Sequence, residues 1–155
     1  MEDEKNHFIK IALDEAKKAS WPFGAVVVKN GEVISQAGSS DGEDYEHDPT
    51  AHAEVNAIRR ASEKLSSGDL SDSTLYASCE PCALCIGACW YAGIKHIVYG
   101  SSLADIENIS ALWGGDLAFP HDHINATGIS IEGGIMKEEV MKMYKSHKKI
   151  LENRK

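Results

Sequence analysis

Apolar residues recur along this chain with two different periods. Between Phe8 and Ala19 they recur every three or four positions, which predicts an amphipathic helix that ends before Trp21-Pro22. The runs Phe23 to Val28 and Glu32 to Gln36 are rich in residues that favour strands. They flank Asn30-Gly31, a pair typical of a tight hairpin turn. The chain is therefore expected to open as helix, strand, turn and strand.

The rest of the chain alternates further helices and strands. Residues 38–48 are polar and contain glycine, which predicts a loop, and residues 101–125 predict a functional loop with a little helix. The other expected elements are the helix Thr50–Leu65, the strand Thr74–Ala77, the helix Pro81–Ala92, the strands Ile94–Tyr99 and Ile129–Glu132, and the helix Met136–Leu151. This order predicts a single α/β domain over residues 1–155, a three-layer α/β/α arrangement with helices on both faces of a mixed sheet.

The composition is that of an ordinary globular protein, with 43% hydrophobic and 26% charged residues in a chain of 155. A net charge of −8 disfavours general binding to phosphate backbones, although a local basic patch would override this average. No stretch has the length of a membrane span, and the first residues lack the apolar core of a signal peptide. We therefore expect a cytoplasmic protein that does not enter a membrane.

Candidate chemistry is concentrated in two short segments, each at the start of a predicted helix. They read Thr50-Ala51-His52-Ala53-Glu54 and Cys79-Glu80-Pro81-Cys82-Ala83-Leu84-Cys85. Zinc binds imidazole nitrogen and thiolate sulfur in a tetrahedron, and three protein ligands leave a fourth position for water. Because Cys82 and Cys85 are one helical turn apart and His52 comes from the other helix, we predict one catalytic Zn2+ per chain at these residues.

Glu54 follows His52 by two residues and need not touch the metal. A carboxylate in that place can take a proton from water and pass it to a ring nitrogen and then to a departing amine. Attack of a metal-activated water on an amino-bearing ring carbon, followed by loss of ammonia, is hydrolytic deamination. We therefore predict that Glu54 is the catalytic proton carrier, and that the backbone amides of Ala53 and Cys82 orient the reacting group.

All four cysteines lie in one short run, Cys79, Cys82, Cys85 and Cys89, which favours a metal site over disulfides. Two alternatives use the same run. A fourth ligand from Cys79 or Cys89 would close the site into a structural zinc centre. The spacing also occurs in ferredoxin-type iron–sulfur proteins, although proline rather than Trp90 should then follow. Otherwise Cys79 and Cys89 are packing residues.

The sequence His52-Ala53-Glu54, followed by Pro81-Cys82-Ala83-Leu84-Cys85, resembles the signature of the cytidine-deaminase-like zinc superfamily. The stretches PFGAVVV at 22–28, DPTAHAEVNAIR at 48–59 and YASCEPCALCIGA at 76–88 are similar to the nucleobase branch that includes bacterial guanine deaminases. The tRNA adenosine deaminases are similar too. The resemblance implies a central five-stranded sheet, one catalytic zinc ion and a homodimer.

The resemblance also indicates residues that would contact the substrate. Phe23 stands where guanine-deaminase-like sequences carry phenylalanine, and it would either stack on a purine or pack in the core. Asp41 stands where relatives carry asparagine. Since a carboxylate only accepts hydrogen bonds, Asp41 would favour rings that present N–H donors, unless Ser39 or Ser40 makes this contact instead.

Two further positions follow from the same resemblance. Tyr91 aligns with a pocket tryptophan of the guanine enzymes, and either it or Trp90 would form a wall of the pocket while the other packs in the core or a dimer interface. An acidic residue from the matching region of those enzymes assists proton movement at the purine. Within residues 104–122 the best candidate for that role is Asp116, with a solvated loop as the alternative.

These observations favour an aminohydrolase that acts on guanine or a related amino-heterocycle. Three alternatives stay open, namely a cytosine or nucleoside deaminase, a tRNA adenosine deaminase, and a zinc or iron–sulfur binding module. The last helix carries lysines that would contact RNA or form a solvated face. The acidic net charge makes a nucleic-acid partner the weaker hypothesis.

Overall fold

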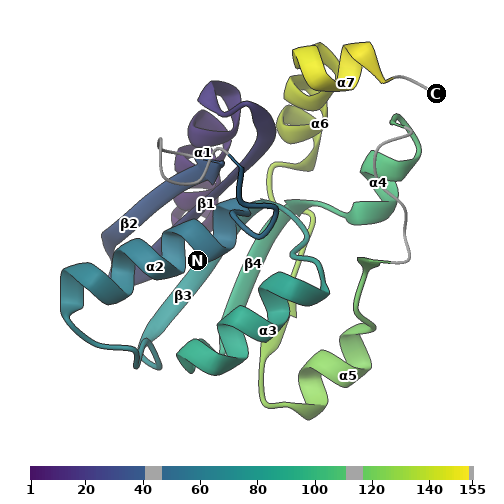
Figure 1. The fold of residues 1–155 in the computed structure, drawn as a ribbon. Helices are drawn as coiled ribbons and strands as arrows, with labels where there is room; N and C mark the ends of the chain where they lie inside the picture. The colour runs from purple at the N-terminus through teal and green to yellow at the C-terminus, as the bar shows by residue number, and fades with distance from the viewer. Residues whose placement is uncertain (41–46, 111–116, 154–155) are drawn as a thin grey trace.

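A computed structural model describes residues 1–40, 47–110 and 117–153 of the chain. Its elements follow one another in the order helix, two strands, and then alternating helices and strands (Figure 1). They are α1 (Glu2–Lys18), β1 (Trp21–Lys29), β2 (Glu32–Ser39), α2 (Ala53–Leu65), β3 (Ser73–Cys79), α3 (Ala83–Ala92), β4 (His96–Ser101), α4 (Leu103–Glu107), α5 (His121–Ala126), β5 (Ser130–Glu132), α6 (Lys137–Ser146) and α7 (Lys148–Glu152).

The five strands form one mixed sheet in the order β2-β1-β3-β4-β5. Strand β1 is antiparallel to both β2 and β3, whereas β3, β4 and β5 run parallel. The β1–β2 hairpin turns at Asn30 and Gly31, which have φ angles of 52° and 76°. Two successive residues with positive φ are the requirement of the tight turn that Asn-Gly favours, so the predicted hairpin is confirmed.

Helices cover both faces of the sheet, which confirms the expected three-layer arrangement (Figure 1). On one face, the cluster of buried residues joins α1 and α6 to alternate strand residues such as Val26 and Val98. On the other face, α2, α3 and α5 pack against the intervening residues such as Val27 and Ile97. Successive strand residues point to opposite faces, so the central strands contribute to two separate cores. No described helix is long and apolar enough to cross a membrane.

The last helix differs from the prediction, because Met136–Leu151 is not one helix. His147 has extended backbone angles, with φ −71° and ψ 136°, and separates α6 from α7. Its Nε2–H donates to the carbonyl oxygen of Ala19 at 3.1 Å, and its Nδ1 accepts the amide of Lys149 at 3.2 Å. These side-chain hydrogen bonds take the place of backbone hydrogen bonds of a continuous helix. The break also rotates the residues that follow it, so that the side chain of Ile150 is buried and that of Leu151 is 42% exposed.

One end of the sheet collects the segments that carry the candidate chemistry. Strands β2 and β3 end there at Ser39 and Cys79, and β1 begins there at Trp21. The β1–β2 register shifts between Trp21 and Gly24, an irregularity that re-aims side chains near a site. Gly24 is required where α1 crosses this end, because a Cβ would lie 1.9 Å from the carbonyl oxygen of Ala12. Ligands bind at such strand ends in open α/β sheets.

Candidate metal centre and pocket

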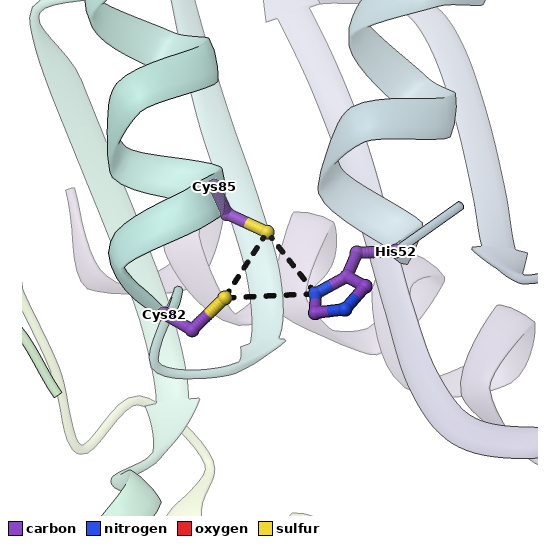
Figure 2. A group of neighbouring side chains, drawn as sticks. All are labelled: His52, Cys82 and Cys85. Atoms are coloured by element: carbon purple, nitrogen blue, oxygen red, sulfur yellow. Dashed lines mark hydrogen bonds between the residues drawn. The ribbon is translucent and has the colours of Figure 1, made fainter. Parts of the chain in front are cut away.

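Three metal-ligating side chains meet where α2 and α3 begin. His52 is the N-cap of α2 and Cys82 is the N-cap of α3, while Cys85 lies in the first turn of α3. Both helices therefore start later than the sequence predicts, and Cys82 precedes its helix rather than lying within it. Figure 2 shows the three side chains pointing toward one another. Among the described residues, they form the group of donors that could hold a metal ion.

The spacing of the three donor atoms fits a tetrahedral ion. His52 Nδ1 lies 3.6 Å from Cys82 Sγ and 3.5 Å from Cys85 Sγ, and the two sulfur atoms are 3.8 Å apart. With metal–sulfur and metal–nitrogen bonds of about 2.3 and 2.05 Å, a regular tetrahedron has N–S edges of about 3.6 Å and an S–S edge of about 3.8 Å. The donors are thus already placed as zinc requires, without rearrangement.

Electrostatics at this centre favour a thiolate. The hydrogen bond with Cys85, assisted by His52, lowers the pKa of Cys82 to about 4. The hydrogen bond with Cys82 raises the pKa of His52. Because metal ions bind the thiolate and not the thiol, a cysteine that ionises easily at neutral pH is a prepared ligand.

Glu54 lies beside the donors, at the start of α2, and its side chain is buried. Its Oε2 accepts a hydrogen bond from the Cys85 thiol at 3.3 Å. Burial raises the pKa of Glu54 to about 7. A carboxyl group with a pKa near neutrality can both take and give a proton at physiological pH, which is the property required of a proton carrier.

A cavity of about 300 Å³ opens onto this centre. Its wall contains both apolar and polar residues. Its apolar lining residues are Trp21, Phe23, Pro49, Ala51, Leu103 and Leu117. Its polar and sulfur-bearing lining residues are Ser39, Ser40, Asp48, His52, Glu54, Cys79, Glu80 and Cys82. A concave, mainly apolar site with a few polar groups is the usual form of a small-molecule pocket.

The predicted substrate residues fall into two groups. Phe23 lines the cavity, and so do Ser39 and Ser40, the alternatives to Asp41. Asp41 and Asp116 lie outside the described residues. The ring of Phe23 also packs against Tyr144, with centroids 6.0 Å apart, so this residue combines the predicted pocket position with the alternative core role.

Ala53 and Tyr91 lie away from the cavity lining. Ala53 is fully buried between His52 and Glu54, where it keeps α2 against the sheet. The side chain of Tyr91 is 84% exposed on this chain and packs edge-on against Trp90, so its place in a pocket wall stays a prediction. Six residues separate Tyr91 from Cys85, which turns the two side chains about 120° apart around α3. Tyr91 therefore points outward on this chain.

Trp21, Asp48 and Glu80 are among the pocket residues that sequence reasoning missed. Trp21 was considered only as the end of a helix, but it precedes Phe23 by two positions, and side chains two apart in a strand share a face. Asp48 and Glu80 each adjoin a ligand segment. Their closeness in sequence to His52 and Cys82 is the signal that could have identified them as pocket residues.

Cys79 and Cys89 are buried, with burial raising both thiol pKa values, and neither belongs to the ligand group. The arrangement thus supports an open three-ligand site, and the two thiols serve as packing residues. A fourth cysteine ligand, required by the structural-zinc and the iron–sulfur alternatives, is not found among the described residues.

Comparison with known proteins places the chain in a family. Residues 3–147 match the model of a family described as MafB19-like deaminase. The chain is 45% identical over 84 residues to a guanine deaminase of Bacillus subtilis, covering 54% of this chain and 53% of that protein. It is 41% identical over 101 residues to a tRNA-specific adenosine deaminase of Aquifex aeolicus, covering 63% of this chain and 66% of that protein. The matches thus span about half to two thirds of these relatives.

The fold agrees with a solved structure. A protein from a study of A-to-I editing by tRNA:A34 deaminases at the wobble position of transfer RNA superimposes with a TM-score of 0.72. The two chains are 30% identical, and the alignment covers 88% of this chain and 98% of the other. The fold thus recurs in a protein from work on tRNA deaminases, and the sequence is similar to relatives named for two different substrates.

Proposed function

Since the chain belongs to the MafB19-like deaminase family, we propose that it is a zinc-dependent hydrolytic deaminase of a free nucleobase, with guanine or a close analogue as the leading substrate. The observation that carries this proposal is the set of three donors at tetrahedral spacing beside a buried carboxyl group, with His52, Cys82 and Glu54 lining one cavity. His52, Cys82 and Cys85 are the proposed ligands, and Glu54 is the proposed proton carrier.

His52, Cys82 and Cys85 would hold a zinc ion, which would supply a Lewis acid that makes water a nucleophile at neutral pH. Glu54 accepts a proton from that water and delivers it to the ring nitrogen, and then to the amine that departs as ammonia. Its burial supports this role, because a carboxyl group removed from solvent has a pKa near 7 and loses little by changing its protonation state.

The aromatic side of the cavity supports a flat heterocyclic substrate. Trp21 and Phe23 both line it from the start of β1, and an aromatic ring can stack on a purine face. The hydroxyl groups of Ser39 and Ser40 line it as well, and each can donate or accept a hydrogen bond at the ring edge. A cavity of about 300 Å³ lies at the small end of the usual range for ligand pockets, which suits a single base.

The charge of the cavity favours a free base over RNA. The described lining residues include no lysine or arginine, whereas Asp48, Glu54 and Glu80 are acidic. A polynucleotide substrate is normally held through its phosphates by cationic side chains, and its binding weakens steeply with salt. The close likeness to tRNA deaminases keeps tRNA as the second candidate, and the experiment below separates the two.

The proposal is tested by measuring ammonia release from a panel of guanine, adenine, cytosine, their nucleosides and a tRNA anticodon stem-loop. We expect the zinc-loaded protein to release ammonia from guanine or a related base. Turnover of the stem-loop alone would favour the tRNA activity, and no release from any compound would refute a deaminase. The same panel with Asp41→Asn, predicted to alter substrate preference, tests the role proposed for that carboxylate.

We further propose that the protein is a homodimer, as its family resemblance implies. The outer face of α3 supports this, because Leu84, Trp90 and Tyr91 are large apolar residues that are 42%, 55% and 84% exposed. Exposed apolar side chains gathered on one element are typical of interaction surfaces. Light scattering is expected to give twice the chain mass for the wild type and the chain mass for Trp90→Glu. A wild-type monomer at micromolar concentration would contradict this proposal.

A further inference from the structure

A second buried carboxylate, Glu80, lies in the pocket wall and has no role in the proton transfers described above. It follows Cys79 at the end of β3, and its side chain is 9% exposed. A buried carboxylate is costly unless its oxygens are hydrogen-bonded. Both are: Oε2 accepts the amide of Leu103 at 3.0 Å, and Oε1 lies 2.9 Å from Nε2 of His121. Because a carboxylate only accepts, His121 is the donor.

These two bonds join three segments that are distant in sequence. Glu80 belongs to the loop that leads to the ligand Cys82, and its own amide donates to the carbonyl oxygen of Ser101 at 2.8 Å. Leu103 is the first residue of α4 and lines the cavity. His121 is the first residue of α5, four positions after Leu117, which lines the cavity although it is 49% exposed.

The imidazole of His121 is also held from a second side. Its ring lies edge-on to that of Tyr99, with centroids 6.2 Å apart. Tyr99 is itself fixed against the backbone, since a Cβ at Gly133 would lie 2.1 Å from the phenol ring. The histidine thus has a defined position and a defined partner, although 42% of its side chain is exposed.

We propose that Glu80 and His121 are positioning residues, and that the hydrogen bond between them holds residues 117–121 in place as a wall of the substrate pocket. Neither side chain needs to touch the reacting atoms. Together, this bond and the bond from the Leu103 amide to Glu80 place Leu117 on one side and Leu103 on the other at fixed distances from the metal ligands. The effect expected on turnover rests on the proposed function, whereas the effect expected on the wall itself does not.

Two substitutions separate the hydrogen bond from the bulk of the ring. His121→Phe keeps an aromatic ring against Tyr99 but removes the N–H donor. His121→Gln keeps an N–H donor that can reach Glu80. His123→Phe is the matched control, because His123 is an exposed histidine of the same helix outside the cavity lining. Each protein is first checked for its zinc content and thermal unfolding, so that only folded, loaded variants are compared.

The first measurement is hydrogen–deuterium exchange of the zinc-loaded protein without substrate. For His121→Phe we expect the amides of 117–126 and of Leu103 to exchange about tenfold faster or more, since a hydrogen bond to a charged group is lost. His121→Gln should restore exchange to within about twofold of the wild type, and His123→Phe should leave it unchanged. Wild-type exchange in His121→Phe, or failure of His121→Gln to restore it, would overturn the proposal.

The second measurement is steady-state turnover of the panel compound that the wild type deaminates. The His121→Phe substitution should raise KM about tenfold and change kcat less than about threefold, because the wall binds the ring but does not carry protons. An equal loss in kcat, with KM unchanged, would overturn the positioning role. If the loaded wild type deaminates nothing in the panel, the proposed function fails, and the exchange comparison alone still decides whether His121 holds the wall.

Discussion

The pocket has two sides that are built in different ways. The ligand side consists of His52, Glu54, Cys82 and Cys85, and it is made from the first residues of two helices. The opposing wall combines the start of β1 with residues from β2, α4 and the segment before α5. The first side is set by spacing within two short segments. The second exists only after distant parts of the chain have packed together.

This difference agrees with the names of the relatives, which refer to two different substrates. The ligand side specifies the chemistry, because three donors and a carboxyl group are sufficient to activate water and move protons. The wall specifies which ring lies next to them. A family can therefore keep the first and alter the second, and the two sides should respond differently to substitution.

The largest effect is expected on the ligand side, from Cys85→Ala. Loss of one of three ligands should reduce zinc from about one ion per chain to near none, and ammonia release by about 10³-fold or more. Cys89→Ala is the control, since it removes a buried thiol one turn later in α3 that does not belong to the ligand group. Metal analysis and turnover should distinguish the two, and equal zinc contents would contradict the ligand assignment.

A smaller effect is expected on the wall, from Phe23→Leu. Loss of ring stacking is worth about 1 kcal/mol, which corresponds to roughly a fivefold to tenfold rise in KM. Zinc content and kcat should change little, because Phe23 does not belong to the group of donors that could hold a metal ion. Phe8→Leu in α1 is the control, a core change that should lower stability without raising KM. A loss of zinc in Phe23→Leu would contradict the claim that the wall and the ligand side have separate roles.

The smallest effect is expected at Asp105, which supports the wall from behind. Asp105 completes a capping box with Ser102 at the start of α4 and lies 2.9 Å from Nζ of Lys137. Burial alone would raise its pKa, but the bonds from Lys137 and Ser102 outweigh burial and lower the pKa below 3.8. A lowered folded-state pKa gives stability that is present above the unfolded-state pKa of about 4 and is lost as the pH falls from there through the folded-state pKa.

Asp105→Asn should therefore lower the free energy of unfolding by about 0.5–1 kcal/mol at pH 7, with little change in KM. Urea unfolding between pH 3 and 7 measures this, and the difference between variant and wild type should shrink below pH 4. Glu107→Gln, two residues on in the same helix, is the matched control for the loss of a carboxylate from α4. A difference that stays constant down to pH 3 would mean that the charge of Asp105 is not what stabilises α4.

The elements that could be predicted from the sequence are those fixed by local rules. The Asn30-Gly31 turn and the strand and helix order follow from residue type and short spacing, whereas the meeting of His52 with Cys82, 30 positions away, and with Cys85 follows from the zinc-ligand chemistry of their two segments. The fold class could be predicted too, because alternating helices and strands allow few arrangements. Each of these is confirmed by the structure.

What could not be predicted depends on tertiary contacts. The break at His147 comes from a bond to Ala19, a residue 128 positions away, and no local signal marks it. The role of Glu80 depends in the same way on Leu103 and His121. The direction of the Tyr91 side chain, which is 84% exposed, likewise could not be read from its position along α3. Tertiary contacts of this kind override local preference.

The central claim is that the three ligands hold zinc while Glu54 carries the protons, and it is tested most directly by Glu54→Gln. This substitution keeps the size and shape of the side chain and removes its ability to exchange a proton. Zinc content and ammonia release are measured side by side on the variant and the wild type. We predict about one zinc ion per chain in both proteins, with kcat about 10²- to 10⁴-fold lower in Glu54→Gln. Equal rates of ammonia release from the two zinc-loaded proteins would contradict the account.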